Sequence, residues 1–178
     1  MRATVTAALL VLFSFTVAWA ETAEASAKQA KPPVGEILGF HVGMPQGEVV
    51  KRLLEMGELV ERKAEPAGKE LEMKQLWNLR DPRFASLIVR FDSHDKLKWI
   101  TAYVREGGPS QLYSDVGDTT VAKLAGRYIY TWKIEARDGK PASVLTARGT
   151  SPERFSSMSL VAAPPPRTAT AIPDSLLR

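Results

Sequence analysis

The chain has 178 residues, of which 44% are hydrophobic, and it carries a formal net charge of +4 at pH 7. This composition is typical of a globular domain and excludes a wholly disordered chain. The absence of cysteine excludes disulfides, thiolate metal sites, thiol nucleophiles and the acylated cysteine of a lipoprotein. The scattered positive charge favours at most weak contact with an anionic membrane surface, and no pattern predicts nucleic-acid binding.

Residues 1–20 have the pattern of a cleaved export signal. Met1 and Arg2 form a short basic start, a mostly apolar stretch follows, and Ala18-Trp19-Ala20 supplies the small residues that signal peptidase recognises. The apolar stretch is shorter than the about 20 residues that a membrane-spanning helix needs. We therefore expect a periplasmic or secreted protein after cleavage near Ala20, with a retained anchor as the alternative.

The remaining chain divides into four predicted segments. Residues 21–34 are rich in Ala, Lys and Glu and are expected to form a flexible tether, and the Pro-rich residues 163–178 a disordered tail. Residues 35–106 are predicted to form a helix plus three strands. Residues 107–162 are predicted to form a second, weaker α+β unit that completes the same domain.

The clearest helix is predicted over residues 45–56. Pro45 suits the first helical position, and apolar residues recur after it at three- and four-residue spacing. Gly57 is expected to end the helix in a left-handed conformation. The residues expected on the apolar face are Val49, Val50, Leu53, Leu54 and Met56.

Three strands are predicted next, over residues 71–79, 84–91 and 97–104, from apolar residues that recur with a period of two. The polar residues 92–95 form a turn between the second and third strands. In the third strand, the alternation predicts one face with Leu97, Trp99 and Tyr103, opposite Ile100, Ala102 and Val104.

A second, weaker series of a helix followed by three strands is predicted after these elements. A short helix is predicted from Asp118 through Leu124, and strands over residues 127–136, 143–147 and 155–161. We therefore predict an α+β fold with a helix packed on an antiparallel β-meander. Whether the unit of a helix and three strands occurs twice, or one meander continues throughout, stays open.

The segment Ile37–Met44 and the helix start Gln46–Leu53 resemble the SmpA/OmlA-like (BamE-like) domains of bacterial envelope proteins, whose fold is shared with β-lactamase-inhibitor-protein repeats. Trp77, the strand Leu87–Asp92 and the return strand Lys96–Ile100 continue this resemblance, which covers roughly residues 37–104. The resemblance implies an envelope domain that acts by binding other proteins.

Few residues suit catalysis or metal binding. His41 is interpreted as structural, and His94 as part of a solvated turn beside Asp92 and Asp95. The sequence has no phosphate-binding glycine loop, dinucleotide fingerprint, HExxH motif or nucleophile elbow. We predict no catalytic, cofactor-binding or metal site and therefore a protein that is not an enzyme; a hydrolase using either histidine is a minor alternative.

Aromatic residues on the predicted strands are the remaining candidates for function. They are expected mainly in the core, with some ring surface left exposed for docking. We predict a protein-binding module whose partner is another envelope protein; the alternative is a carrier or sensor of a small apolar or anionic ligand. The oligomeric state stays open. The candidate surface residues are Trp99, Tyr103, Tyr128, Tyr130 and Trp132.

Overall fold

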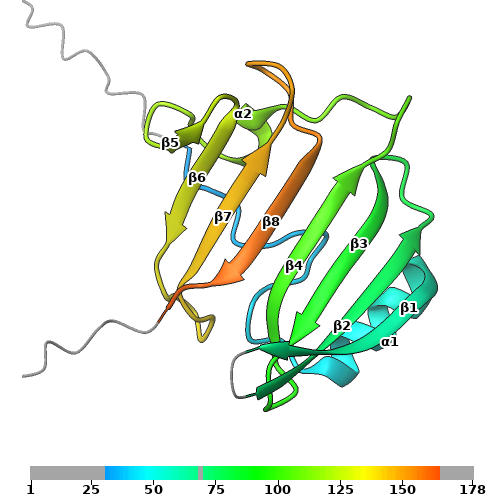
Figure 1. The fold of residues 1–178 in the computed structure, drawn as a ribbon. Helices are drawn as coiled ribbons and strands as arrows, with labels where there is room; N and C mark the ends of the chain where they lie inside the picture. Colours follow the sequence, from blue (N-terminus) through cyan, green and yellow to red (C-terminus); the bar gives the residue numbers. More distant parts are fainter. Residues whose placement is uncertain (1–30, 68–69, 165–178) are drawn as a thin grey trace, which may run out of the picture.

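The computed structural model describes residues 31–67 and 70–164. The predicted signal, most of the predicted tether and nearly all of the predicted tail lie outside the described residues. The described chain forms one eight-stranded antiparallel sheet in the order β1-β2-β3-β4-β8-β7-β6-β5 (Figure 1). The elements are α1 (Gln46–Met56), β1 (Gly57–Ala67), β2 (Glu70–Leu79), β3 (Phe84–Phe91), β4 (Leu97–Val104), α2 (Tyr113–Val116), β5 (Lys123–Gly126), β6 (Ile129–Ile134), β7 (Ser143–Arg148) and β8 (Ser157–Ala162).

The sheet consists of two four-stranded meanders that meet at its centre. Strands β1 to β4 pair in chain order, and so do β5 to β8. The last strand of each meander joins the two, through pairs such as Trp99 with Val161 and Tyr103 with Ser157. Residues distant in the sequence therefore become neighbours on β4 and β8.

The α+β prediction is wrong, because the described chain is predominantly β-structure. Its helices are α1, with eleven residues, and α2, with four. The predicted helix from Asp118 through Leu124 is absent from the described residues: Lys123–Gly126 pairs with β6 as a strand, and the helical turn lies earlier, at Tyr113–Val116. The predicted unit of a helix and three strands occurs in neither half, since each half contributes four strands.

The other predicted strands are found close to their expected positions. Strands β3 and β4 have the predicted bounds, β2 begins one residue early, and β7 ends one residue late. Strand β6 is shorter than predicted, and β8 begins two residues late. Strand β1 was not predicted at all.

The transition from α1 to β1 differs from the expected helix end. Gly57 has φ −174°, which is extended backbone and not the left-handed conformation, and its N–H donates to the Leu53 carbonyl. Close approach explains the glycine instead, since a Cβ here would lie 2.0 Å from the backbone oxygen of Asn78. Gly43, in the approach to α1, does have a left-handed φ of +87°.

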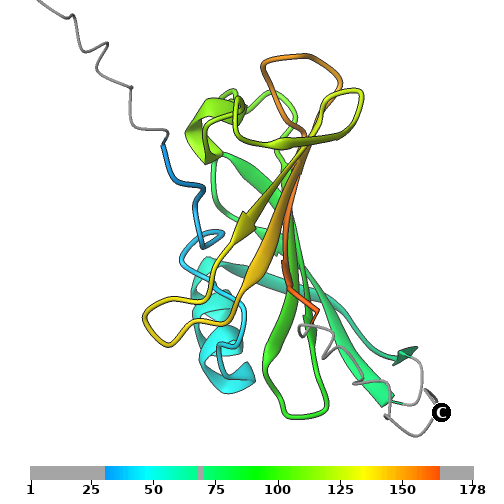
Figure 2. The ribbon, with the colours of Figure 1, turned by 90° about the vertical axis from the view of Figure 1, so that its left-hand side faces the viewer.

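Among the described residues, one face of the sheet is covered and the other, which we call the open face, is not (Figure 2). The N-terminal segment and α1 lie on the covered side, where apolar side chains from both meanders form one continuous core. Leu53 on α1 is fully buried, whereas Leu54, expected on the same apolar face, is 61% exposed. The largest fully buried side chains are Trp77, Tyr113, Phe40, Phe91, Ile37, Met44, Leu53, Leu87, Leu97, Ile100, Leu145 and Leu160.

A β-bulge changes the predicted faces of β4. The register shifts between Arg90 and Phe91, which pair with Trp99 and Leu97, so Lys98 is an extra residue. Leu97 is consequently buried, on the same side as Ile100 and Ala102, whereas the Trp99 side chain reaches the open face. The prediction that Leu97 and Trp99 share a face is therefore wrong.

Candidate functional site

Cross-strand pairing places a row of hydroxyl side chains across the open face. Thr101 on β4 pairs with Ser159 on β8, Ser159 with Thr146 on β7, and Thr146 with Thr131 on β6. We call these four residues the hydroxyl row. Because paired residues of neighbouring strands point to the same side of a sheet, the four hydroxyl groups lie in line at the regular spacing of the strands, with Thr101 buried and the other three half-buried.

Hydrogen bonds connect the hydroxyl row to the ring of Trp99. The indole Nε1 donates to Thr101 Oγ1 at 2.8 Å, and Thr101 Oγ1 lies 2.9 Å from Ser159 Oγ. Since the indole N–H is only a donor, Thr101 accepts from it and can donate its own proton to Ser159. On the far half of the row, Thr131 and Thr146 hydroxyls lie 3.4 Å apart.

Trp99 and Tyr103 are the exposed aromatic residues of this face. They flank Thr101 on β4, with exposed fractions of 37% and 41%. The Arg90 guanidinium lies over the Trp99 ring, 4.6 Å from its centre, and also forms a 3.1 Å ion pair with Glu65. Stacking on one side and the Nε1 hydrogen bond at the edge hold the indole in one orientation.

Ion pairs fix the β1–β3 side of this surface. Glu65 pairs with Lys74 at 3.2 Å as well as with Arg90, and Glu72 pairs with Lys98 at 2.5 Å. The hydrogen bond from Lys74 holds the pKa of the Glu65 carboxyl below its usual 4.5, against the opposing effect of desolvation. A lowered folded-state pKa of Glu65 means that its two ion pairs persist at neutral pH and are lost only as the pH falls through that lower value.

The structure separates the aromatic residues predicted as one surface. Trp99 and Tyr103 lie together on the open face, but Trp132 is buried on the opposite face, where its Nε1 donates to the Asp118 carbonyl. Tyr130 is half-buried beside it, its ring centre 4.6 Å from that of Tyr113. Tyr128, with φ 60°, precedes β6, and its carbonyl accepts from the Tyr113 hydroxyl.

The two histidines have no partners that suggest catalysis. His41 is half-buried, and its Nδ1 lies 2.9 Å from the Val42 carbonyl oxygen. His94 is exposed in the turn before β4, where the Asp92 carboxylate accepts from the backbone N–H groups of His94 and Lys96. Within residues 31–67 and 70–164, no group of three or more His, Asp or Glu side chains could hold a metal ion.

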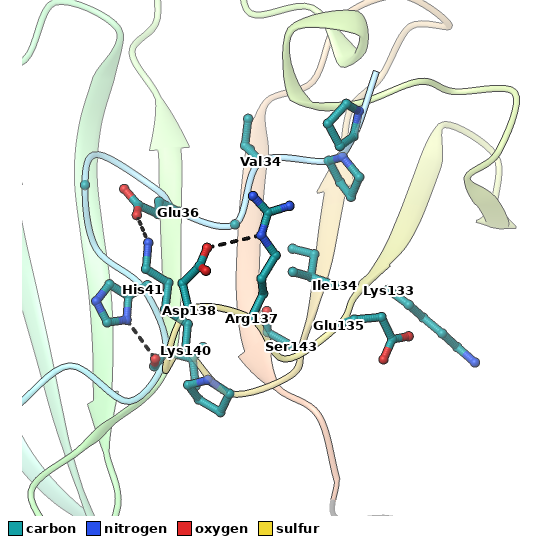
Figure 3. A pocket seen from close by; sticks show the side chains of 16 residues that line it. Val34, Glu36, His41, Lys133, Ile134, Glu135, Arg137, Asp138, Lys140 and Ser143 are labelled. Carbon is teal, nitrogen blue, oxygen red and sulfur yellow. Dashed lines mark hydrogen bonds and ion pairs between the residues drawn. The ribbon is translucent and has the colours of Figure 1, made fainter. Parts of the chain in front are cut away.

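The covered side has a pocket of about 720 Å³ between the N-terminal segment and the loop that joins β6 to β7 (Figure 3). Glu36 forms an ion pair with Lys140, and Arg137 Nε pairs with Asp138 Oδ2 at 3.1 Å. Lys133 and Glu135 also belong to the lining, which thereby has equal numbers of basic and acidic residues, although the Lys133 side chain extends away from the pocket and toward the open face (Figure 3). The pocket therefore has no net formal charge that would select an anion.

A second hollow, of about 580 Å³, lies between α1 and the β1–β2 hairpin. Leu54 and Leu59, which are 61% and 45% exposed, contribute apolar surface there. Its volume falls within the usual range for small-molecule sites, and its lining mixes apolar residues with Gln46, Arg62, Gln75 and Asp95.

Comparison of this chain with protein-family models, with curated proteins and with solved structures gave no match. The resemblance to SmpA/OmlA-like domains therefore stays a prediction. No helix in the described part of the chain is long and apolar enough to span a membrane. The hydroxyl row was missed from the sequence, because only the pairing of β4 with β8 brings Thr101 and Ser159 together.

Proposed function

We propose that this protein is a non-catalytic module of the bacterial envelope, exported to the periplasm or secreted, that binds another envelope protein through the open face of its sheet. The observation that carries the proposal is the fixed, partly exposed ring of Trp99 beside the hydroxyl row. An aromatic side chain held in one rotamer loses little entropy on binding, which is why such residues often dominate interface energies.

The composition of the open face also supports a protein partner. Trp, Tyr and Arg are enriched in the cores of protein interfaces, and Ser and Thr hydroxyls adapt their hydrogen bonds to a partner. On this face Trp99, Tyr103 and Arg90 surround Thr101 and Ser159. Such a mixture offers both apolar and polar contacts to a partner.

Docking on the face is favoured over docking along the edge of the sheet. Strand β1 forms one edge, and it has a register shift at Val60, charged residues and Pro66, all of which discourage addition of another strand. Strand β5 forms the other edge and has only four residues. The larger uninterrupted surface is the open face.

Trp99→Ala should weaken capture of an envelope partner, because it removes the central aromatic anchor and leaves Thr101 without its indole donor. Truncation of an interface anchor costs about 2 kcal/mol or more, or roughly a thirtyfold loss of affinity. The immobilised protein and its variants would be incubated with envelope extract, and the captured protein identified and titrated. Leu124→Ala is the matched control, because Leu124 is 62% exposed and pairs with Tyr130 on the other side of the sheet.

Equal capture by wild type, Trp99→Ala and Leu124→Ala would contradict docking on this face. Circular dichroism of each variant would show whether the fold is retained. The small-ligand alternative is supported only by the two hollows, whose linings each mix acidic, basic and apolar residues and so favour no one class of ligand.

A further inference from the structure

The β5–β8 half of the open face is basic. Lys123 on β5, Lys133 on β6 and Arg148 on β7 all point to the open face, as shown by their pairing with Thr131, Val144 and Ser157. All three are exposed, and none forms an ion pair with another described residue. Within these four strands no acidic residue faces the same way; the nearest along the chain, Glu135, follows the end of β6.

The basic residues surround the hydroxyl row. Lys123 pairs with Thr131 and so extends the hydroxyl row at that end. Lys133 lies in the adjacent row of cross-strand pairs on one side of the hydroxyl row, and Arg148 lies in the adjacent row on the other side. Because Thr101 accepts from the Trp99 indole, its own proton is available to Ser159, and the Ser159 hydroxyl can then donate outward. The surface therefore offers cations and hydroxyl donors to an anionic group that accepts hydrogen bonds.

We propose that the partner presents a carboxylate-rich, acidic protein surface to this half of the open face. The inference rests on the proposed protein-binding function and specifies the chemistry of the partner. Carboxylates are the anions that protein surfaces supply, and they accept charge-assisted hydrogen bonds from Lys, Arg and hydroxyl groups together. A complementary charge pattern raises the rate of association and excludes basic competitors.

A second copy of the chain does not fit this requirement. In the β1–β4 half of the open face the described acidic and basic residues are equal in number, so the cations of the other half make the face as a whole positive and two copies would repel. The charged residues that face outward in the β1–β4 half are Glu58, Glu61, Glu65 and Glu72, with Lys63, Lys74, Arg90 and Lys98.

A bilayer surface fits less well than a protein. The exposed rings of Trp99 and Tyr103 lie on a central strand of the sheet, between residues of the neighbouring strands β3 and β8, and not at the tip of a protruding hairpin. The hydroxyl row has a fixed spacing set by the sheet, which suits a partner with fixed acceptors. Fluid headgroups gain nothing from such spacing.

The test uses a labelled poly-L-glutamate peptide as the acidic probe and measures its binding by fluorescence anisotropy. A poly-L-glutamine peptide gives the neutral comparison, and vesicles of phosphatidylcholine with phosphatidylglycerol give the lipid comparison. The double variant Lys133→Glu with Arg148→Glu reverses the charge beside the hydroxyl row. The control, Lys51→Glu with Lys96→Glu, changes the net charge equally at exposed positions on α1 and in the turn before β4.

We expect poly-L-glutamate to bind the wild type in a salt-dependent manner, and the Lys133/Arg148 variant to bind it roughly tenfold more weakly. The Lys51/Lys96 variant should change affinity by less than about threefold, as expected for remote surface charges. Equal weakening by both variants would overturn the proposal, because net charge alone would then explain binding. Vesicle binding that depends on Lys133 and Arg148, without peptide binding, would also overturn it in favour of lipid.

The two proposals can fail separately. Capture of an envelope protein that is lost in Trp99→Ala, but unchanged in the Lys133/Arg148 variant, would reject the acidic surface and leave the docking face intact. Peptide binding that depends on Lys133 and Arg148, with capture indifferent to Trp99→Ala, would reject the proposed function of the face. Loss of capture in Trp99→Ala, together with loss of peptide binding in the Lys133/Arg148 variant, would support both proposals.

Discussion

Leu53→Ala should lower the free energy of unfolding by about 2–5 kcal/mol, the usual effect of emptying a packed leucine site. Leu53 is fully buried at the centre of α1, and Val49 one turn earlier is buried with it. The side chain belongs to the core between α1 and the covered face of the sheet. A domain of this size is stable by only about 5–15 kcal/mol, so thermal and urea unfolding should detect the change clearly.

Lys51→Ala is the control for this prediction. Lys51 lies two residues earlier on the same helix and is exposed, so its replacement should alter stability by no more than about 0.5 kcal/mol. Equal unfolding midpoints for Leu53→Ala and Lys51→Ala would contradict the packing of α1 against the sheet.

Gly57→Ala should destabilise the protein by about 1–3 kcal/mol, the range for overpacking, and by the upper part of that range because the clash is with backbone. The added Cβ would lie 2.0 Å from the Asn78 carbonyl oxygen and 3.1 Å from the Leu79 Cα. Gly57 pairs with Leu79 where α1 passes into β1, so relief of the clash must move the helix end or the first pair of the β1–β2 ladder. Urea unfolding of the purified variant measures the loss.

Gly47→Ala is the control for this prediction, and it should change the free energy of unfolding in the opposite direction. Gly47 lies in the first turn of α1, and a Cβ there would meet no atom within 4 Å. Alanine should therefore stabilise the helix by about 0.5–1 kcal/mol, since it has less freedom to lose on folding. A stabilising effect at both positions would contradict the close approach of Gly57 to β2.

Local patterns in the sequence predicted the bounds of the strands with an apolar period of two. Leu87, Val89 and Phe91 recur at this period, and the structure has β3 over the predicted residues Phe84–Phe91. Strand β1 was missed because its sequence, Gly57–Ala67, is dominated by charged residues. Its strand conformation is set by pairing with β2, a tertiary contact that no local pattern shows.

The face assignment on β4 failed for a related reason. One extra residue, Lys98, interrupts the alternation, so Leu97 and Trp99 point to opposite sides although they are two residues apart. The predicted helix after Asp118 failed because Lys123–Gly126 gains more from pairing with β6 than from a short isolated helix.

The candidate site was predicted only in part. Trp99 and Tyr103 were predicted to expose part of their rings for docking, and the structure has both side chains exposed. Trp132 has the same local pattern, but the turns of its meander place it in the core. The hydroxyl row could not be predicted, because Thr101 and Ser159 are 58 positions apart in the sequence and meet only through the pairing of β4 with β8.

Site-specific photo-crosslinking tests docking on the open face most directly. A photoreactive phenylalanine analogue would replace Tyr103 on the open face or Leu124 on the opposite side of the sheet, and both proteins would be irradiated in intact envelopes. We expect one covalent adduct with a single partner from position 103 and no such adduct from position 124. The same adduct from both positions, or an adduct only from position 124, would contradict docking on the open face.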